Sequence, residues 1–213
     1  MVDPYYDDGD RVIFHGDCRE ILPALTADVI VTDPPYGMAY VSNSARHGST
    51  DPIAGDADTG LRDWILEAWG DRPSLTFGTW RMPRPECRTL LVWDKGDSPG
   101  MGDLTLPWGP SHEEVYVRGK GWVVDGRRAG VLHHAGLSAG DKSRPDHPTP
   151  KPVSLMADLL RACPPAWVVL DPFMGSGSTL RAAKDLGRKA IGIECEEKYC
   201  EMAAERLGQE LLF

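Results

Sequence analysis

One stretch of the chain indicates its fold: Val168-Val169-Leu170-Asp171-Pro172-Phe173-Met174-Gly175-Ser176-Gly177-Ser178-Thr179. Its apolar run ends at Asp171-Pro172, because proline offers no amide to a sheet. The two glycines then allow a tight turn that brings the backbone close to a ligand before a helix begins. Glu194, roughly twenty residues further on, can accept hydrogen bonds from a ribose diol. The stretch predicts a nucleotide-binding strand–turn–helix unit; a plain tight turn and a solvated glutamate are the simpler interpretations.

This glycine turn lacks the marks of two common phosphate-binding motifs. No Gly-Lys-Ser/Thr follows at the spacing of a phosphate-binding loop, and the third glycine of the dinucleotide fingerprint is missing. The ligand is therefore expected to be a nucleotide held in another way.

Outward from this stretch, strand-like and helix-like segments alternate. Strands are expected over 11–15, 28–32, 74–78, 89–93, 114–117, 166–170 and 190–193, and helices over 18–25, 61–69, 153–163, 178–186 and 198–212. Residues 37–60 and 118–150 show no period. The alternation predicts an α/β fold, in which a mostly parallel sheet carries helices on both faces.

Composition sets wide limits. The 213 residues carry a net charge of -9, with a sequence pI near 5.1, and 41% are hydrophobic, as expected for a single globular domain over 1–213. No apolar run reaches the ~18 residues of a membrane span. The acidic N-terminus and an odd number of cysteines without a CxxC pair predict a cytoplasmic protein with reduced thiols. The total charge alone argues against a nucleic-acid partner.

A second motif is Asp33-Pro34-Pro35-Tyr36, which follows an apolar run. Two prolines stiffen the backbone and leave their carbonyls free. Asp33 and the Pro34 carbonyl can accept from an amino group, and Tyr36 offers a surface for stacking. The motif predicts a pocket for a planar base with an exocyclic amine; a Pro-Pro turn with a surface tyrosine is the alternative.

Together the two motifs resemble those of DNA amino-methyltransferases, which use S-adenosylmethionine. In most methyltransferases of this class I, Rossmann-like fold the glycine motif comes first. Here it follows the Pro-Pro-Tyr motif, as in the circularly permuted beta group. Further segments resemble the family, at Gly16-Asp17, 91–95, 112–115 and 147–152.

The resemblance implies a role for each matching residue. The target base would be held by Asp33, Pro34, Pro35 and Tyr36. The cofactor would be bound by Asp17 at its adenine, Glu194 at its ribose, Thr149 and Lys151 near its methionine carboxylate, and the turn residues Asp171, Pro172, Phe173, Gly175, Ser176, Gly177 and Thr179. Position 150 departs from the family pattern, because proline replaces the commoner glutamine.

The charge is unevenly distributed. Residues 115–151 hold seven basic and three acidic side chains, so this window is +4 and the remainder is -13. The resemblance places a small target-recognition insertion at 118–146. We expect Arg118, Lys120, Arg127 and Arg128 to contact phosphates of double-stranded DNA; an ordinary solvated loop is the alternative.

The expected activity is methylation of the N6 amino group of a flipped-out adenine in DNA. Asp33 favours adenine, since cytosine-N4 enzymes of the group more often carry serine there. An RNA or protein-glutamine methyltransferase, which usually begins the motif with asparagine, and a silent DNA-binding relative are the other readings. A homodimer and a cognate restriction endonuclease are the further partners considered. The histidines and cysteines lack metal-ligand spacing, so no metal is expected.

Overall fold

One mixed sheet runs through the molecule. The computed structural model describes residues 3–38, 55–97, 100, 102–137 and 150–209. Within them, the strands lie in the order β1-β2-β9-β8-β3-β4-β6-β5-β7. Their bounds are β1 Tyr6–Asp7, β2 Arg11–His15, β3 Val29–Thr32, β4 Ser74–Gly78, β5 Thr89–Asp94, β6 His112–Arg118, β7 Val131–His133, β8 Val169–Asp171 and β9 Ala190–Glu194.

The strand directions decide where a ligand can bind. Strands β1 and β6 are antiparallel to their neighbours, and the remaining strands all run one way. Strands β2, β9, β8, β3, β4 and β5 therefore end together at one side of the sheet, here called the carboxyl edge; the other side is the opposite edge. In open α/β sheets, ligands bind beyond the carboxyl ends of the strands.

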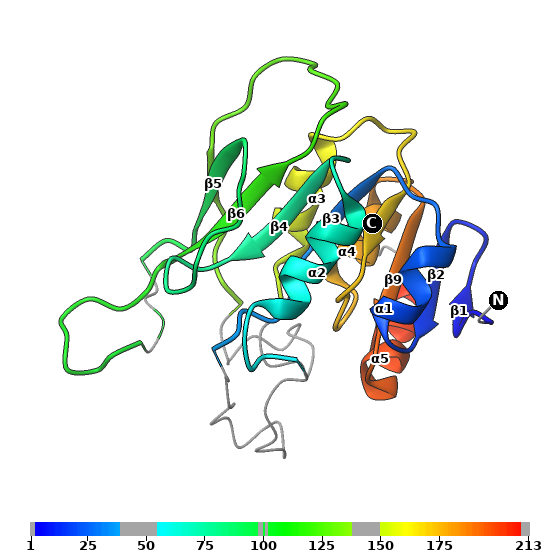
Figure 1. Cartoon of the computed structure of the whole chain (residues 1–213), viewed down its shortest axis with the longest axis horizontal. Coiled ribbons are helices and arrows are strands. Elements are labelled where there is room, and N and C mark those ends of the chain that lie inside the picture. Colours follow the sequence, from blue (N-terminus) through cyan, green and yellow to red (C-terminus); the bar gives the residue numbers. More distant parts are fainter. Residues whose placement is uncertain (1–2, 39–54, 98–99, 101, 138–149, 210–213) are drawn as a thin grey trace.

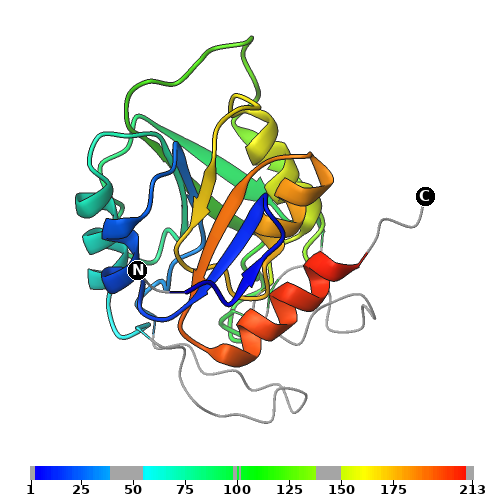
Figure 2. The ribbon, with the colours of Figure 1, turned by 90° about the vertical axis from the view of Figure 1, so that its right-hand side faces the viewer.

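Helices cover both faces of the sheet (Figures 1 and 2). Helices α3 (Val153–Arg161), α4 (Ser178–Asp185) and α5 (Glu197–Gly208) pack on one face through residues such as Leu160, Leu180 and Leu207. The other face is covered by α1 (Cys18–Ile21), the 3-10 helix η1 (Leu22–Ala24) and α2 (Gly60–Trp69). Buried residues such as Ile30 and Val31 point to opposite faces and fill these two cores.

The predicted α/β fold, with its helix-covered, mostly parallel sheet, is confirmed. The expected single helix over 18–25 is two short ones, since Pro23 cannot continue the hydrogen bonds of α1. The strand β7 lies in a segment read as irregular. It has three residues, and among the described strands it pairs with β5, so its sequence carries little periodic signal. The predicted insertion at 118–146 lies partly outside the described residues.

Candidate active site

The two sequence motifs meet at the centre of the carboxyl edge. Strand β3 leads into Asp33 and its neighbour β8 ends at Asp171. The Thr32 hydroxyl donates a 2.6 Å hydrogen bond to Asp171 Oδ1. Both Thr32 and Asp171 are buried, so this bond fixes the target-base motif against the glycine motif.

Asp33 lies in a cluster of charged side chains. Its Oδ2 is paired with Lys151, and its Oδ1 lies 2.7 Å from the Tyr36 hydroxyl. That hydroxyl also lies 2.9 Å from Glu113 Oε2. Glu113 is paired with Lys95 at 2.5 Å and with Lys151 at 3.2 Å. Two carboxylates and two ammonium groups thus balance one another around Tyr36.

The pKa values of this cluster follow from burial and pairing. Burial raises the pKa of Asp33, and Lys151 opposes that rise. Burial also raises the pKa of Glu113, but Lys151 and Lys95 outweigh it and bring the value to about 2. The pKa of Tyr36 is raised well above its usual value by burial and by both carboxylates, so its hydroxyl stays a donor.

The side chain of Asp33 remains 21% exposed at this edge, whereas that of Lys151 is 7% exposed. The Asp33 carboxylate can therefore reach a ligand while Lys151 supports it from within the protein. Such an arrangement offers a fixed acceptor to a group that carries N–H bonds.

The glycine turn is organised by Asp171. Its carboxylate accepts from Thr32, from Thr179 at the start of α4, and from the Phe173 amide at 3.1 Å. All three donors are neutral. Burial raises the pKa of Asp171 to about 6, against the lowering by these hydrogen bonds.

Beyond Asp171 the backbone turns tightly against α5 and β9. Gly177 has a φ of +75°, and a Cβ built there would lie 2.7 Å from the Ala203 Cβ. The Gly175 amide donates at 3.0 Å to Glu194 Oε2, and the Glu196 amide donates at 2.9 Å to Glu194 Oε1. Only glycine fits at 177, and the carboxylate of Glu194 is held at the mouth of the turn.

These residues fit a nucleoside cofactor. Gly177 lets the turn pack closely against Ala203 of α5, and Glu194, held by the Gly175 amide, supplies a fixed acceptor at the end of β9. The Gly16 amide donates to the Glu194 carbonyl at 2.8 Å, so the β2 end lies beside it. At the carboxyl edge, Glu194, the expected acceptor for a diol, thus lies beside the end of β2, where Asp17 is the expected acceptor for the cofactor's adenine amine.

Comparison with known proteins agrees with this geometry. A family model described as DNA methylase, covering N6-adenine and N4-cytosine enzymes, matches residues 62–205. The chain belongs to this DNA methylase family. The type II methyltransferase M.ScaI of Streptomyces caespitosus is 38% identical over 97% of this chain and 84% of its own.

Two solved structures share the fold. The crystal structure of an M1.HpyAVI–SAM complex is 25% identical, covers 93% of this chain and 100% of its own, and has a TM-score of 0.69. The PvuII DNA methyltransferase, described as cytosine-N4-specific, is 15% identical over 99% of this chain and 90% of its own, with a TM-score of 0.68. The methylase therefore has the class I methyltransferase fold, as predicted.

Two predicted cofactor residues of the methylase lie at the carboxyl edge with other partners. The Asp17 carboxylate accepts from the Arg19 amide at 2.8 Å and pairs with the Arg19 guanidinium, so it begins α1. Lys151 is neutralised by Asp33 and Glu113 on the target-base side. Thr149 lies outside the described residues. Ser176 is buried, and its carbonyl accepts from Arg206 at 3.2 Å.

Residues that the sequence interpretation left out of the site include Glu113, Lys95, Thr32 and Asp56. The buried Asp56 accepts from the Gly37 amide at 2.7 Å and so holds the turn after Tyr36. The available signal for Lys95 and Glu113 was the resemblance of segments 91–95 and 112–115 to the family. Strand β6 begins earlier than the expected strand 114–117, so Glu113 and Glu114 both lie in it, point to opposite faces, and each pair with a cation.

The four residues predicted to contact phosphates lie away from Asp33. Arg118 pairs in register with Ser74, at the start of β4, and therefore lies at the opposite edge. Lys120 pairs with Asp71 at 2.5 Å, and Arg128 donates to the Arg161 carbonyl at 3.1 Å. Arg127 is exposed in the same 119–130 loop, which rises from the far end of β6 in Figure 1. DNA contact by these four residues stays a prediction.

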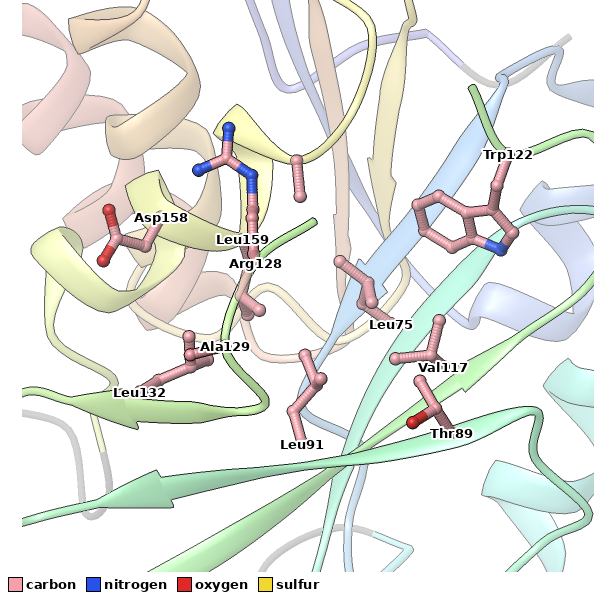
Figure 3. A pocket seen from close by; sticks show the side chains of 11 residues that line it. Leu75, Thr89, Leu91, Val117, Trp122, Arg128, Ala129, Leu132, Asp158 and Leu159 are labelled. Carbon is pink, nitrogen blue, oxygen red and sulfur yellow. The ribbon is translucent and has the colours of Figure 1, made fainter. Parts of the chain in front are cut away.

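A cavity of about 200 Å³ opens between α3 and the sheet (Figure 3). Its lining is mostly apolar and includes Leu75, Thr89 and Val117, which lie towards the starts of β4 and β5. Those positions are on the far side from Asp33. The cavity is therefore separate from the pocket expected for a target base.

Two other predictions concern metals and membranes. Within the described ranges, no group of three or more His, Cys, Asp or Glu side chains is placed to hold a metal ion. In the part of the chain that the structure describes, every helix is too short or too polar to cross a bilayer.

Proposed function

We propose that this DNA methylase transfers a methyl group from S-adenosylmethionine to the N6 amino group of an adenine flipped out of double-stranded DNA. The observation that carries the proposal is the partly open Asp33 carboxylate at the end of β3, supported by Lys151 and Tyr36 and tied through Thr32 to the glycine turn.

The amino nitrogen of adenine is a weak nucleophile because its lone pair is delocalised into the ring. The Asp33 carboxylate and the Pro34 carbonyl can each accept a hydrogen bond from one of the two amino N–H groups. These hydrogen bonds favour a pyramidal nitrogen whose lone pair can attack the sulfonium methyl. The prolines and Lys151 hold these acceptors in place before the base arrives. Catalysis by the chain is then positioning and electrostatics, without a covalent intermediate on the enzyme.

The cofactor supplies an electrophilic methyl group when bound. Glu194 holds the ribose, the turn from Phe173 to Gly177 lines the methionine end, and Thr179 keeps Asp171 in place beneath it. Asp17 and Thr149 are the further cofactor residues of this proposal. Lys151 serves the target-base side, as its partners Asp33 and Glu113 support.

A base inside a duplex cannot reach Asp33, so it has to leave the stack, at a cost of a few kcal/mol. Stacking on Tyr36 offsets about 1–3 kcal/mol of this cost. The pKa of Tyr36 is raised by burial, so the ring stays neutral and its hydroxyl keeps its position on Asp33.

Asp33 favours adenine because cytosine enzymes of this group more often carry serine at that position. The likeness of the fold to the PvuII enzyme makes N4-cytosine methylation the second candidate. A homodimer, a companion endonuclease and a cytoplasmic location remain predictions.

Nucleoside analysis tests the proposal. DNA without prior methylation is incubated with the protein and cofactor carrying a labelled methyl group, then digested to nucleosides. Labelled N6-methyl-2′-deoxyadenosine is the expected product. Label in N4-methyl-2′-deoxycytidine would establish the second candidate, and DNA without label would refute both.

A further inference from the structure

The proposed reaction leaves a gap in the duplex where the target base was stacked, and resting on that proposal we infer which part of the chain fills it. We propose that residues 102–110, here called the β5–β6 tip, insert apolar side chains into the DNA stack beside the flipped base. Leu104 and Trp108 are its principal contacts.

The first observation is position. The tip lies between β5 and β6, and these strands pair at Asp94 and His112, which is the carboxyl edge. In Figure 1 it projects beyond the ends of both strands, on the side where β4 ends and away from the 119–130 loop.

The second observation is attachment. Lys95, just after β5, is paired with Glu113, the second residue of β6. Glu113 in turn lies 2.9 Å from the Tyr36 hydroxyl. Lys95 and Glu113, which flank the segment that carries the tip, are thus joined to each other, and Glu113 contacts the tyrosine on which the target base is expected to stack. Gly100 also donates to the Pro110 carbonyl at 2.8 Å, which closes the base of the tip.

The third observation is the chemistry of the tip. Leu104, Leu106 and Trp108 are 79%, 58% and 80% exposed. Of the nine large apolar side chains that are exposed among the described residues, six lie at the carboxyl edge: Tyr5 beside the end of β2, and Met38, Trp80, Leu104, Leu106 and Trp108 in segments that leave from this edge. Three of them lie within residues 104–108 of the tip, and a contiguous exposed apolar surface usually marks a binding site.

DNA is the partner that fits this surface. The family acts on DNA, and the duplex has to approach the carboxyl edge for a base to reach Asp33. Apolar wedges such as Leu and aromatic side chains that enter a base step are a known means of holding a duplex open. Arg81, which stands 5.4 Å from the Trp80 ring just beyond the end of β4, supplies positive charge at the same carboxyl edge. A second copy of the chain is the competing occupant.

The test compares paired and mismatched DNA. The methylated sequence is first read from DNA modified by the wild-type protein, and short duplexes are made with the target base either paired or opposite a mismatch. We expect Trp108→Ala and Leu104→Ala each to lower kcat/KM roughly tenfold on paired DNA. On mismatched DNA, where unpairing costs less, each should return to within about threefold of wild type.

Val124→Ala is the matched control. Val124 is 77% exposed and lies in the 119–130 loop at the opposite edge, so the substitution should change neither rate. Equal rates for Trp108→Ala and the control would overturn the inference. So would an equal loss on both duplexes, or a change in oligomeric state by sedimentation, since these would assign the tip to folding or to a second copy. If wild-type protein labels no DNA, the proposed function itself has failed.

Discussion

Asp33 and Asp171 stand at the ends of neighbouring strands, yet their surroundings differ. Asp33 is partly open and paired with Lys151, while Asp171 is 3% exposed and its donors among the described residues, Thr32, Thr179 and the Phe173 amide, are neutral. A carboxylate that has to be ready for a ligand thus has an ammonium group beside it. One that only organises a turn relies on hydroxyl and amide groups. Burial raises the pKa of both carboxyl groups, to about 6 for Asp171, and Lys151 opposes the rise at Asp33.

The largest effect is expected when Asp33 itself is removed. Asp33→Ala should lower methyl transfer by at least about a thousandfold, because the main acceptor for the amine is lost. Cofactor affinity should stay within about threefold, since Asp171 and Glu194 are untouched. Label incorporation measures methyl transfer, and calorimetric titration with the cofactor measures cofactor affinity separately. Normal turnover by this variant would show that Asp33 is not the acceptor for the amine and would refute the contrast between Asp33 and Asp171.

Asp171→Asn should change stability in a pH-dependent way. The folded-state pKa of about 6 lies above the usual 3.8, so the folded protein binds more protons in that range and loses stability as pH rises from about 4 to 7. The loss is on the order of 3 kcal/mol. The Asn variant should lack it, as urea unfolding at several pH values would reveal.

Asp103→Asn is the control for that experiment. Hydrogen bonds from Thr105 lower the pKa of Asp103, so its contribution to stability has the opposite sign and is lost as pH falls. A wild-type pH dependence that survives in Asp171→Asn would show that other carboxyl groups cause it, such as Glu194, whose pKa is also raised by burial.

Glu113→Gln tests how the charges around Asp33 set its pKa. The negative charge of Glu113 helps to raise the pKa of Asp33, and methyl transfer requires the Asp33 carboxylate. Removing that charge should move the acidic limb of the pH–rate profile to lower pH and reduce kcat roughly tenfold through a misplaced Tyr36. Cofactor affinity should not change.

Glu114→Gln is the matched control for Glu113→Gln. Glu114 is the next residue of β6 and lies on the opposite face, where its carboxylate pairs with Arg84 and accepts from the Tyr116 hydroxyl. This control should leave the acidic limb in place. A shift of the limb in both variants would point to a general change of the sheet instead of a positioning role for Glu113.

The smallest effect is expected at the opposite edge. Joint substitution of Arg127 and Arg128 by alanine should weaken DNA binding by no more than about threefold and slightly flatten its salt dependence. Arg127→Ala alone keeps the contact of Arg128 with α3, and so separates binding from stability. A loss above about tenfold would mean that the duplex reaches across to that edge.

The sequence predicts well where the strands of the carboxyl edge end, and poorly which charged side chains pair with one another there. Apolar runs that stop at Asp33-Pro34 and Asp171-Pro172 locate strand ends, and parallel strands bring those ends together. The partner of Lys151 depends on β6 running antiparallel between β4 and β5, which places Glu113 beside Tyr36. No local pattern encodes that contact, because its members are far apart in the chain.

The basic segment shows the same limit for charge. Counting residues over 115–151 treats them as one surface. The register of β6 instead puts Arg118 next to Ser74 at the opposite edge, while Lys151 lies at the carboxyl edge. A window along the chain averages over both edges, so its sign says little about either.

The bond between Thr32 and Asp171 also bears on how the protein is made. It joins residues 139 positions apart, and β3 pairs with β8 across the same span. Closing so long a loop is slow and entropically costly. During synthesis the fully buried β3 segment has to wait for β8 before its neighbour on that side exists. A nascent chain halted before β8 would therefore expose the apolar residues of β3, which are prone to aggregate, and would lack an active site. The pairing of β3 with β8 is thus the folding step at which chaperone dependence and misfolding are expected.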